Sequence, residues 1–328
     1  MKYKTIGILG GSGFVGQHLS ALLDNKGYQV RILSRKADKH PELSLIPGVS
    51  IESGDAFDPD VLKGFFTRVD AVINLIGILN EKKDNGKEFH RIHVDMAHRI
   101  AMACETSSIT RLLHMSALKA DASKGSSYYL RSKGEAEDWL HHASELGLEV
   151  TSFRPSVIFG AQDRFLNRFG ELLKLTPLVF PLACAHSHFA PVYIGDVCRA
   201  FLVALDNPET IGRRYELCGP KTYTLGELVQ FTATSLGLKR LVIGLPGFLS
   251  LLQARILGML PTKPFTVDNY RSLQTESICT ENGLPLLGIQ PTSLESVAPQ
   301  FLGNNSRKGN LNVYRKQRHY VCLGKHLR

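Results

Sequence analysis

The sequence predicts an α/β protein with a doubly wound parallel sheet and a small C-terminal α/β lobe. Three observations lead to this prediction. Apolar runs alternate with stretches of helical length through residue 156 of the 328-residue chain. Runs such as AVINLIG at 71–77 are apolar except for one Asn, which is typical of parallel strands that are buried on both faces. A glycine-rich turn joins the first run to the first helical stretch, and such an alternation builds a doubly wound sheet.

The predicted elements follow one another along the first half of the chain. Strands are expected at residues 5–10, 29–35, 49–55, 71–77, 111–117 and 150–156, and helices at 14–26, 59–67, 88–106 and 128–146. After residue 156 the pattern is less regular, with short strands in HFAPVY and RRYELCG and helices at 194–206 and 224–236. We therefore expect a sheet domain at 1–160, a C-terminal region at 161–302 of which parts of 189–220 return to the sheet, and a basic tail at 303–328.

The charge of the chain is concentrated at its C-terminus. Lys and Arg number 39 and Asp and Glu 30, which gives a net charge of +9. Seven of these cations lie in residues 303–328, which contain no Asp or Glu, so the rest of the chain is nearly neutral. The excess is compatible with nucleic acid, an anionic membrane surface or an acidic partner. Nucleic acid is not expected, because only Tyr314 and Tyr320 in the tail could stack on bases.

The cysteines and histidines do not form metal-binding patterns. None of the six cysteines pairs at C-x-x-C spacing, so we expect a reducing compartment, no disulfide framework and no zinc site. The histidines of the HRIHVDMAH stretch lack the carboxylates or cysteines that would complete a ligand set. Glycines interrupt the apolar run at the N-terminus and no cleavage site follows it, so no targeting segment is expected. The expected location is cytoplasmic, peripheral to the inner membrane.

A glycine motif marks the junction of the first strand and the first helix. Gly10, Gly13 and Gly16 have G-x-x-G-x-x-G spacing. Glycines allow the tight turn and the close approach of a pyrophosphate, and the free N–H groups of the helix start then bind the anion. The alternative is a plain glycine turn, but the position of the motif between a strand and a helix favours a dinucleotide site.

The end of the second predicted strand indicates which dinucleotide binds. Sites for NAD usually carry an acid there, whereas sites for NADP place an Arg near the 2′-phosphate. This strand ends in Arg35 and Lys36, and an Arg can pair with a phosphate through two hydrogen bonds. NADPH is therefore the expected cofactor, with NADH as the alternative if these cations only form a solvated loop. Asp55, which ends the third strand, would then lie beside the adenine.

A tyrosine and a lysine share one face of the helix predicted at 128–146. Tyr129 and Lys133 are four residues apart. A nearby ammonium favours the phenolate and lowers the pKa of a tyrosine, which can then exchange a proton with a substrate oxygen while a hydride moves to or from the nicotinamide. Ser116, at the end of the fifth strand, is a third candidate catalytic residue. The alternative is a structural helix pair, which the preceding glycine motif and five strands disfavour.

These motifs together resemble the short-chain dehydrogenase/reductase superfamily in its extended and atypical branches. The segments GGSGFVG, VRILSR, YLRSKGEAE, FRPSVIFG and YELCGPKTYTLGEL are similar to the NADPH-binding accessory subunits of respiratory complex I and their bacterial relatives. The resemblance covers about residues 4–302. It implies a Rossmann fold, a dinucleotide-binding domain at 1–160, and a nicotinamide dinucleotide as partner.

The resemblance also assigns roles to individual positions. It places the glycines at the pyrophosphate, Arg35 at the 2′-phosphate, and Tyr129 and Lys133 at the catalytic pair. The complete expected cofactor-binding set is Gly10, Ser12, Gly13, Phe14, Val15, Gly16, Arg35, Lys36, Asp55, Ala56, Leu75, Ile76, Gly77, Lys133, Pro155 and Ser156. In many relatives an Asn on the fourth helix supports proton relay, but HRIHVDMAHRI has His93 followed by Val94 there.

Two functions follow from this interpretation. The first is an accessory-subunit-like oxidoreductase or an NADPH-stabilised module that is linked to quinone or respiratory metabolism. The second is an active NADPH-dependent reductase, or an enzyme like a nucleotide-sugar epimerase or dehydratase, that acts on a small or isoprenoid carbonyl substrate. Residues 247–260, GFLSLLQARILGML, are apolar around most of a helix. They form either a buried helix of the lobe or a helix that binds a membrane surface or a membrane-associated respiratory assembly.

Overall fold

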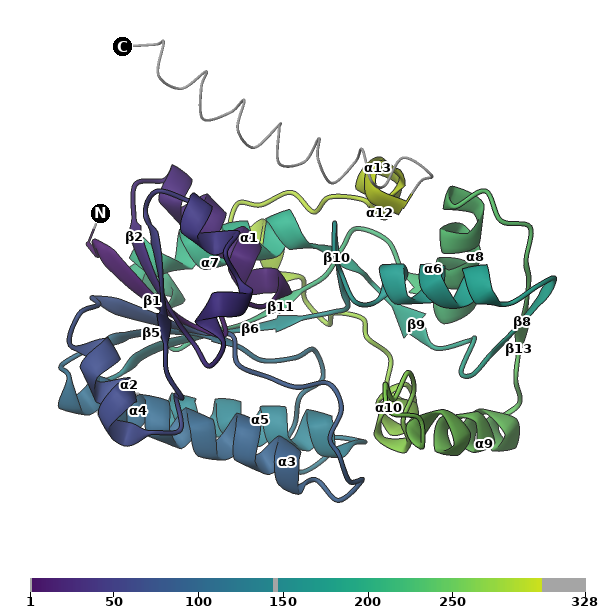
Figure 1. Ribbon diagram of the computed structural model, residues 1–328, viewed down its shortest axis with the longest axis horizontal. Helices are drawn as coiled ribbons and strands as arrows, with labels where there is room; N and C mark the ends of the chain where they lie inside the picture. Colours follow the sequence, from purple (N-terminus) through teal and green to yellow (C-terminus); the bar gives the residue numbers. More distant parts are fainter. Residues whose placement is uncertain (1, 144–146, 303–328) are drawn as a thin grey trace, which may run out of the picture.

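The computed structural model describes residues 2–143 and 147–302 (Figure 1). The predicted tail at 303–328 lies outside the described residues. Seven strands form one parallel sheet in the order β11-β6-β5-β4-β1-β2-β3. Their bounds are β1 Thr5–Leu9, β2 Gln29–Ser34, β3 Val49–Ser53, β4 Ala71–Asn74, β5 Arg111–Met115, β6 Glu149–Pro155 and β11 Arg214–Leu217. All seven strands are parallel, but the direction in which successive strands are added to the sheet reverses between β1 and β4. Ligands of such sheets bind at this switch point.

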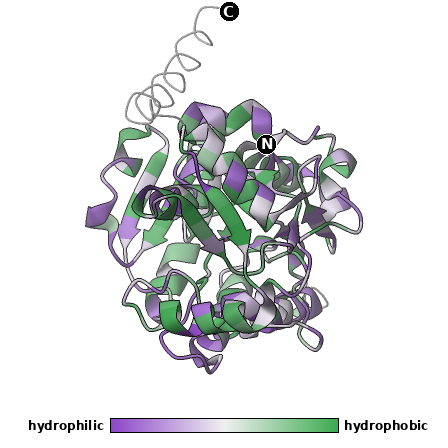
Figure 2. Cartoon of the chain, turned by 90° about the vertical axis from the view of Figure 1, so that its right-hand side faces the viewer, coloured by the Kyte–Doolittle hydropathy of each residue, from purple (hydrophilic) through white to green (hydrophobic). Residues whose placement is uncertain are grey.

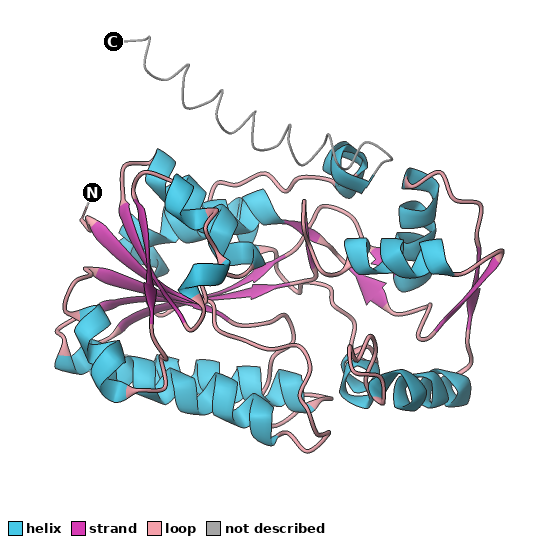
Figure 3. Cartoon of the chain, viewed as in Figure 1, coloured by secondary structure: helices cyan, strands magenta, loops and turns pink. Residues whose placement is uncertain are grey.

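Helices cover both faces of the sheet, as Figures 1 and 3 show. One face packs against α1 (Phe14–Asn25) and α7 (Ile194–Asp206), and the other against α2 (Pro59–Phe66), α4 (Met96–Thr106) and α5 (Tyr128–His142). The two apolar cores bury every side chain of β4 and β5, because both faces of a parallel sheet are covered. The predicted doubly wound fold is confirmed.

The observed elements differ from the predicted ones mainly at their ends. The predicted strand at 71–77 ends at Asn74, because the apolar residues that follow belong to a loop at the edge of the sheet. The single helix predicted at 88–106 consists of α3 (Lys87–His90), a π-helical turn at Arg91–Asp95, and α4. Such π turns occur often at functional sites. The helix predicted at 128–146 ends at His142 in α5.

The lobe lies at the side of the sheet that is opposite to the N-terminus (Figure 1). Its helices are α6 (Leu166–Leu175), α8 (Leu225–Ser235), α9 (Gly247–Gly258), α10 (Val267–Ser272), α12 (Leu294–Val297) and α13 (Pro299–Leu302), whereas α11 (Gly283–Leu286) packs on β11 of the sheet. Three strand pairs complete the chain: β7 (Ile158–Phe159) with β10 (Val192–Tyr193), β9 (His188–Phe189) with β12 (Tyr223–Thr224), and β8 (Val179–Leu182) with β13 (Leu241–Gly244). The division of the chain at residue 160 stays a prediction. Two elements beyond that residue, α7 and β11, pack on the sheet.

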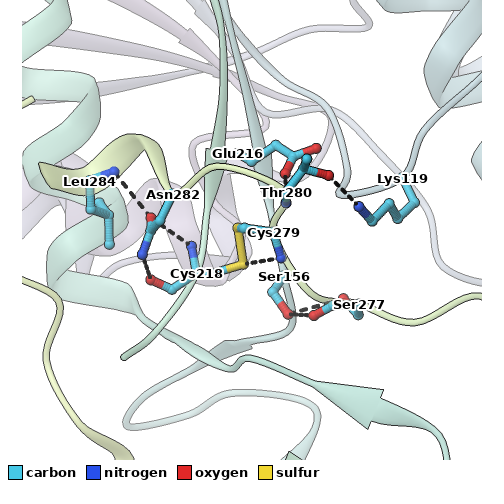
Figure 4. Close-up of a disulfide and its surroundings, with 9 residues drawn as sticks. All are labelled: Lys119, Ser156, Glu216, Cys218, Ser277, Cys279, Thr280, Asn282 and Leu284. Carbon is cyan, nitrogen blue, oxygen red and sulfur yellow. Dashed lines mark hydrogen bonds between the residues drawn. A yellow bond between two sulfur atoms is a disulfide. The ribbon is translucent and has the colours of Figure 1, made fainter. Parts of the chain in front are cut away.

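The structure corrects the expectation for the cysteines. Cys218, directly after β11, and Cys279, in the segment that follows α10, form a disulfide with their Cα atoms 6.0 Å apart (Figure 4). The prediction of a chain without disulfides was based on sequence spacing. These two residues lie 61 positions apart, and only the folding of the segment against β11 brings them within bonding distance.

Candidate functional site

The glycine turn has the shape that a pyrophosphate requires. Gly10 has a φ of +79°, and a Cβ on it would lie 2.9 Å from the carbonyl carbon of Leu75. A Cβ on Gly16 would overlap the backbone of Gly11. Gly13 caps α1 without a side-chain hydrogen bond, and the first turn of α1 contains no acid. The turn therefore allows close backbone approach, and the start of α1 leaves its N–H groups to an anion.

The end of β2 lies beside this turn. The hydroxyls of Ser12 and Ser34 are 3.4 Å apart, which joins the turn to the strand. Arg35 and Lys36 follow directly and are both exposed. Asp55 is also exposed and accepts from the backbone N–H of Phe57 at 3.1 Å. The positions that sequence reasoning selected after β2 thus lie next to the glycine turn, with two cations at this edge.

Lys133 reaches the carboxyl ends of β4 and β5. Its Nζ donates to the carbonyl oxygens of Met115 at 2.9 Å and Ile76 at 3.4 Å. The side chain is 4% exposed, and burial lowers the pKa of Lys133 to about 8, an effect that Glu137 opposes. Leu75, Ile76 and Gly77 form the loop over which Lys133 lies, and a Cβ on Gly77 would be 3.1 Å from Nζ. The structure therefore brings together the β4 loop and the lysine that were selected from the sequence.

Tyr129 packs among aromatic rings. The ring centroids of Phe89 and His93 lie 5.9 Å and 5.7 Å from that of Tyr129. Burial raises the pKa of Tyr129 to about 12. This direction is opposite to the lowering that we expected from Lys133, because the cost of burying a charged phenolate dominates. The catalytic role of Tyr129 stays a prediction.

His93 takes part in a hydrogen-bond network at the position where the family resemblance led us to look for an Asn. Its Nε2 accepts from the backbone N–H of Ile78 at 3.2 Å, so the ring proton lies on Nδ1, which is 2.8 Å from the hydroxyl of Ser132. Burial and the charge of Lys133 hold the pKa of His93 well below its usual range. His93 is therefore neutral and fixes the loop after β4 to α5.

The hydroxyl of Ser116 is engaged by a buried carboxylate. This hydroxyl donates to the carboxylate of Glu137 at 2.6 Å. Glu137 is fully buried, and the guanidinium of Arg154 lies 2.9 Å from both carboxylate oxygens while that of Arg214 lies 3.5 Å from one. Burial raises the pKa of Glu137, and the two guanidinium groups oppose this shift. Sequence reasoning missed Glu137, although its position four residues after Lys133 placed it on the same helix face.

A carboxylate from the lobe caps the N-terminus of α5. Asp268, on α10, accepts from the backbone N–H groups of Tyr128 at 2.8 Å and Tyr129 at 3.2 Å. The side chain of Asp268 is buried. A carboxylate at a helix N-terminus satisfies otherwise unpaired N–H groups. The backbone of Tyr129 is thus held by the other lobe, which no sequence signal indicated, because TVDNYRS marks only the start of its own helix.

Pro155 and Ser156 end β6 on the side expected for the nicotinamide. The Ser156 hydroxyl donates to the carbonyl oxygen of Ser277 at 2.8 Å. Ser277 precedes Cys279 by two residues, so the disulfide and Ser156 hold the same segment (Figure 4). This covering segment was not foreseen from the sequence.

The helix α9 exposes an apolar face at the lobe. Phe248, Leu252, Ile256 and Met259 lie three or four residues apart, and 49–85% of each side chain is exposed. Within α9 only Ser250 and Ala254 are buried, while Leu249, Leu251 and Leu257 are half-buried. Gln253 pairs with the backbone of Pro181 and Ala183 at 3.1 Å. The helix is thus apolar around most of its circumference, and a large part of that apolar surface is exposed. The alternative of a buried lobe helix for residues 247–260 is wrong, because only Ser250 and Ala254 of α9 are buried.

The exposed apolar face continues onto the neighbouring strands. Figure 2, which views this side of the molecule, shows hydrophobic ribbon at α9 and at the β8–β13 pair. We call the following residues the apolar lobe surface: Leu175, Leu178, Val179, Leu241, Ile243, Phe248, Leu252, Ile256, Met259 and Leu260. Within residues 2–143 and 147–302, no helix is both long and apolar enough to span a membrane.

The fold and the site define a dinucleotide-binding α/β protein. Residues 6–218 match the model of the NAD dependent epimerase/dehydratase family, and the chain belongs to this family. Its cofactor class is therefore a nicotinamide dinucleotide, and the free N–H groups of α1, the Cβ-free glycines and the cationic end of β2 fit that group. The resemblance to extended short-chain dehydrogenases is confirmed.

Individual relatives are similar over most of the chain. The mouse protein named NADH dehydrogenase (ubiquinone) 1 alpha subcomplex subunit 9, mitochondrial, is 28% identical over 296 residues, which cover 88% of this chain and 77% of that protein. The ceramide reductase of Caulobacter vibrioides is 28% identical over 243 residues, 74% of this chain and 73% of that protein. The UDP-glucose 4-epimerase of Thermotoga maritima, 16% identical, superposes with a TM-score of 0.74 and covers 94% of this chain and 99% of that one. The last comparison supports the fold.

Proposed function

We propose that this chain is an NADPH-binding module that docks on an anionic membrane surface as part of a membrane-associated respiratory assembly. The observation that carries this proposal is the apolar face of α9, on which Phe248, Leu252 and Ile256 are exposed. An exposed apolar area of this kind marks a site of protein or membrane interaction. An amphipathic helix that lies in the plane of the bilayer buries such a face among the lipid headgroups and acyl chains.

The charges around the apolar lobe surface favour an anionic membrane. Residues 236–266 contain Lys239, Arg240, Arg255 and Lys263, but no Asp or Glu. Cations near a membrane surface gain about 1 kcal/mol each from anionic lipids. The similarity to a mitochondrial protein named as a subunit of NADH dehydrogenase supports a place beside a respiratory membrane complex.

The residues of the site bind and orient the cofactor. The N–H groups at the start of α1 would hold the pyrophosphate, Arg35 the 2′-phosphate, and Lys133 the ribose hydroxyls. When it is bound, the nicotinamide supplies or accepts a hydride. Three features favour slow turnover or none: Ser116 is engaged by Glu137, His93 replaces the relay Asn, and burial raises the pKa of Tyr129.

Membrane docking predicts the behaviour of a surface variant. The double substitution Phe248→Ser/Ile256→Ser is expected to lower binding to vesicles that contain phosphatidylglycerol at least tenfold, because each apolar side chain contributes about 1.5–3 kcal/mol when it is fully buried. Vesicle flotation measures the bound fraction. Leu45→Ser, which changes an equally exposed apolar residue on the sheet domain, is the matched control and should bind as the wild type does. Equal binding by the double variant would rule out this surface.

The preference for NADPH predicts the effect of removing Arg35. Arg35→Ala should weaken NADPH binding by about tenfold or more, since a hydrogen bond to a charged group contributes about 1.5–3 kcal/mol. Binding of NADH should change little, because NADH lacks the 2′-phosphate. Calorimetric titration with each nucleotide gives both affinities. Lys26→Ala, an exposed cation at the far end of α1, is the control. A wild type that binds NADH more tightly than NADPH would overturn the preference.

A second candidate is an NADPH-dependent reductase that acts on a lipid-like carbonyl. The retained pair of Tyr129 and Lys133 favours it, together with the similarity to a ceramide reductase. In this case Tyr129 would donate a proton to the substrate oxygen. The apolar lobe surface would then hold the enzyme at the membrane that contains its substrate. NADPH oxidation that requires an added long-chain ketone would favour this enzyme over the module.

A further inference from the structure

We propose that the Cys218–Cys279 disulfide is a redox-sensitive clamp on the nicotinamide side of the cofactor site. The inference rests on the proposed dinucleotide binding and adds a means of regulating it. The clamp segment is residues 275–282, which follows α10 and contains Cys279. Cys218 is the residue after β11, at the edge of the sheet, and its side chain is 3% exposed. The disulfide therefore fixes the clamp segment to the rigid sheet (Figure 4).

The clamp segment contacts the end of β6, where the nicotinamide is expected. The Ser156 hydroxyl binds both the carbonyl oxygen of Ser277 at 2.8 Å and its hydroxyl at 3.0 Å. The backbone of Ser277 also pairs with Ala190 and His188, at 3.0 Å and 2.9 Å. A displacement of Ser277 would therefore change the position of the Ser156 hydroxyl and the lining of this side of the site.

The clamp segment is connected in sequence to the start of α5. It follows directly after α10, whose Asp268 accepts from the backbone N–H groups of Tyr128 and Tyr129. The hydroxyls of Thr275 and Ser126 are 2.8 Å apart, which links the segment to the residues before α5 a second time. The segment that the disulfide fixes is thus linked both to the start of α5 and to the end of β6.

Apart from the packing of Cys279 against Leu118 and Ala190, the remaining contacts of the clamp segment are exposed or half-buried hydrogen bonds. Thr280 accepts from the Lys119 ammonium at 3.1 Å, and its backbone N–H donates to Glu216 at 2.6 Å. Asn282 exchanges hydrogen bonds with the backbone of Cys218 at 2.8 Å and 3.3 Å. Segments that rest on exposed hydrogen bonds and few apolar contacts open locally at low cost. Without the disulfide, this segment would open more often.

The chemical step is a thiol–disulfide exchange. Cys279 is half-buried and next to exposed Thr280, whereas Cys218 is buried, so an incoming thiolate reaches the Sγ of Cys279 first. A dithiol attacks this sulfur, the Cys218 thiolate leaves, and the second thiolate of the dithiol then displaces Cys279. The clamp gains two electrons and two protons and becomes two thiols, while the dithiol becomes a disulfide.

The clamp requires reciprocal coupling between nucleotide and disulfide. If the disulfide strengthens nucleotide binding, then bound nucleotide must stabilise the disulfide by the same factor. Saturating NADPH should therefore shift the equilibrium of Cys218 and Cys279 toward the disulfide in a redox buffer of reduced and oxidised dithiothreitol. Mass spectrometry after alkylation of the thiols follows the reduction of Cys218 and Cys279 separately from the other cysteines.

The test compares the full-length protein in its two redox states. The chain is oxidised with oxidised glutathione or reduced with dithiothreitol, its thiols are counted by alkylation, and NADPH affinity is measured by nucleotide fluorescence. Reduction is expected to weaken binding about fivefold or more, within the usual range of such couplings. Circular dichroism checks that the reduced protein remains folded. Cys279→Ser should bind as the reduced wild type does and should not respond to dithiothreitol.

The control is Cys184→Ser, which changes a half-buried free cysteine and should retain the full response to reduction. Equal NADPH affinity in both redox states of a protein that binds NADPH would overturn the clamp and leave the proposed function intact. Failure of oxidised glutathione to join Cys218 to Cys279 would also overturn it. Absence of nucleotide binding in both states would instead overturn the proposed function on which the clamp rests.

Discussion

Replacing Gly16 by Ala is expected to abolish dinucleotide binding and to lower the free energy of unfolding by about 1–3 kcal/mol, the usual cost of overpacking. The new Cβ would overlap the backbone of Gly11. Backbone atoms cannot move aside by a rotamer change, and Gly11 is itself packed against Ile32. The start of α1 would have to move away from the glycine turn, so its N–H groups would no longer converge on one anion.

Titration with NADPH and urea unfolding measure the two effects of Gly16→Ala. The matched control is Gly64→Ala on α2, because Gly64 is exposed and a Cβ there meets nothing within 4 Å. This control should raise the free energy of unfolding by about 0.5–1 kcal/mol, the usual difference between Gly and Ala inside a helix. Normal NADPH affinity in Gly16→Ala would mean that the phosphates bind elsewhere.

The second large effect is expected for Lys133→Met and depends on pH. Burial lowers the pKa of Lys133 from 10.5 to about 8. Between these values the unfolded chain binds more protons than the folded chain, so the stability of the wild type rises with pH over this window. Below pH 8 the folded state carries the full cost of the buried ammonium. The shift corresponds to about 3 kcal/mol at 1.36 kcal/mol per pKa unit.

The free energies of unfolding of the wild type and Lys133→Met should therefore differ in pH dependence. Relative to the variant, the wild type should gain about 3 kcal/mol between pH 7.5 and pH 11, by urea unfolding of the protein without nucleotide. Burial raises the pKa of the thiols of Cys104 and Cys198, which destabilises both proteins above pH 9 and cancels in the difference. Lys63→Met, an exposed lysine on α2, is the control. Parallel curves for wild type and Lys133→Met would show that Lys133 titrates normally.

Much of the sheet domain could be predicted because its signals are local. The buried strands β1 and β4 carry short apolar runs, and the turn between β1 and α1 requires glycine at defined positions. The spacing of Tyr129 and Lys133 follows from the helix period alone. The end of β4 was placed too late, because Leu75 and Ile76 are as apolar as the strand but form the loop at the cofactor edge.

The features that were missed depend on contacts between distant parts of the chain. Asp268 lies far along the chain from Tyr129, and Glu137 meets Arg214 only because β11 joins the sheet beside β6. The pairing of Cys218 with Cys279 has the same origin. No periodic pattern records such pairs, since each partner looks locally like a helix start or a loop residue. The π-helical turn before α4 also left no sign in the apolar period.

Because β11 lies at the edge of the sheet, the sheet can be completed only after this strand has been synthesised. Strand β11 follows α6, β8 and α7 in the chain, yet it covers the edge of β6 and brings Arg214 to the buried carboxylate of Glu137. A nascent chain that has reached only residue 160 has β6 as an open edge, and Glu137 lacks one of its cationic partners. The edge of the sheet beside β6 is therefore completed only after residue 217 has been synthesised.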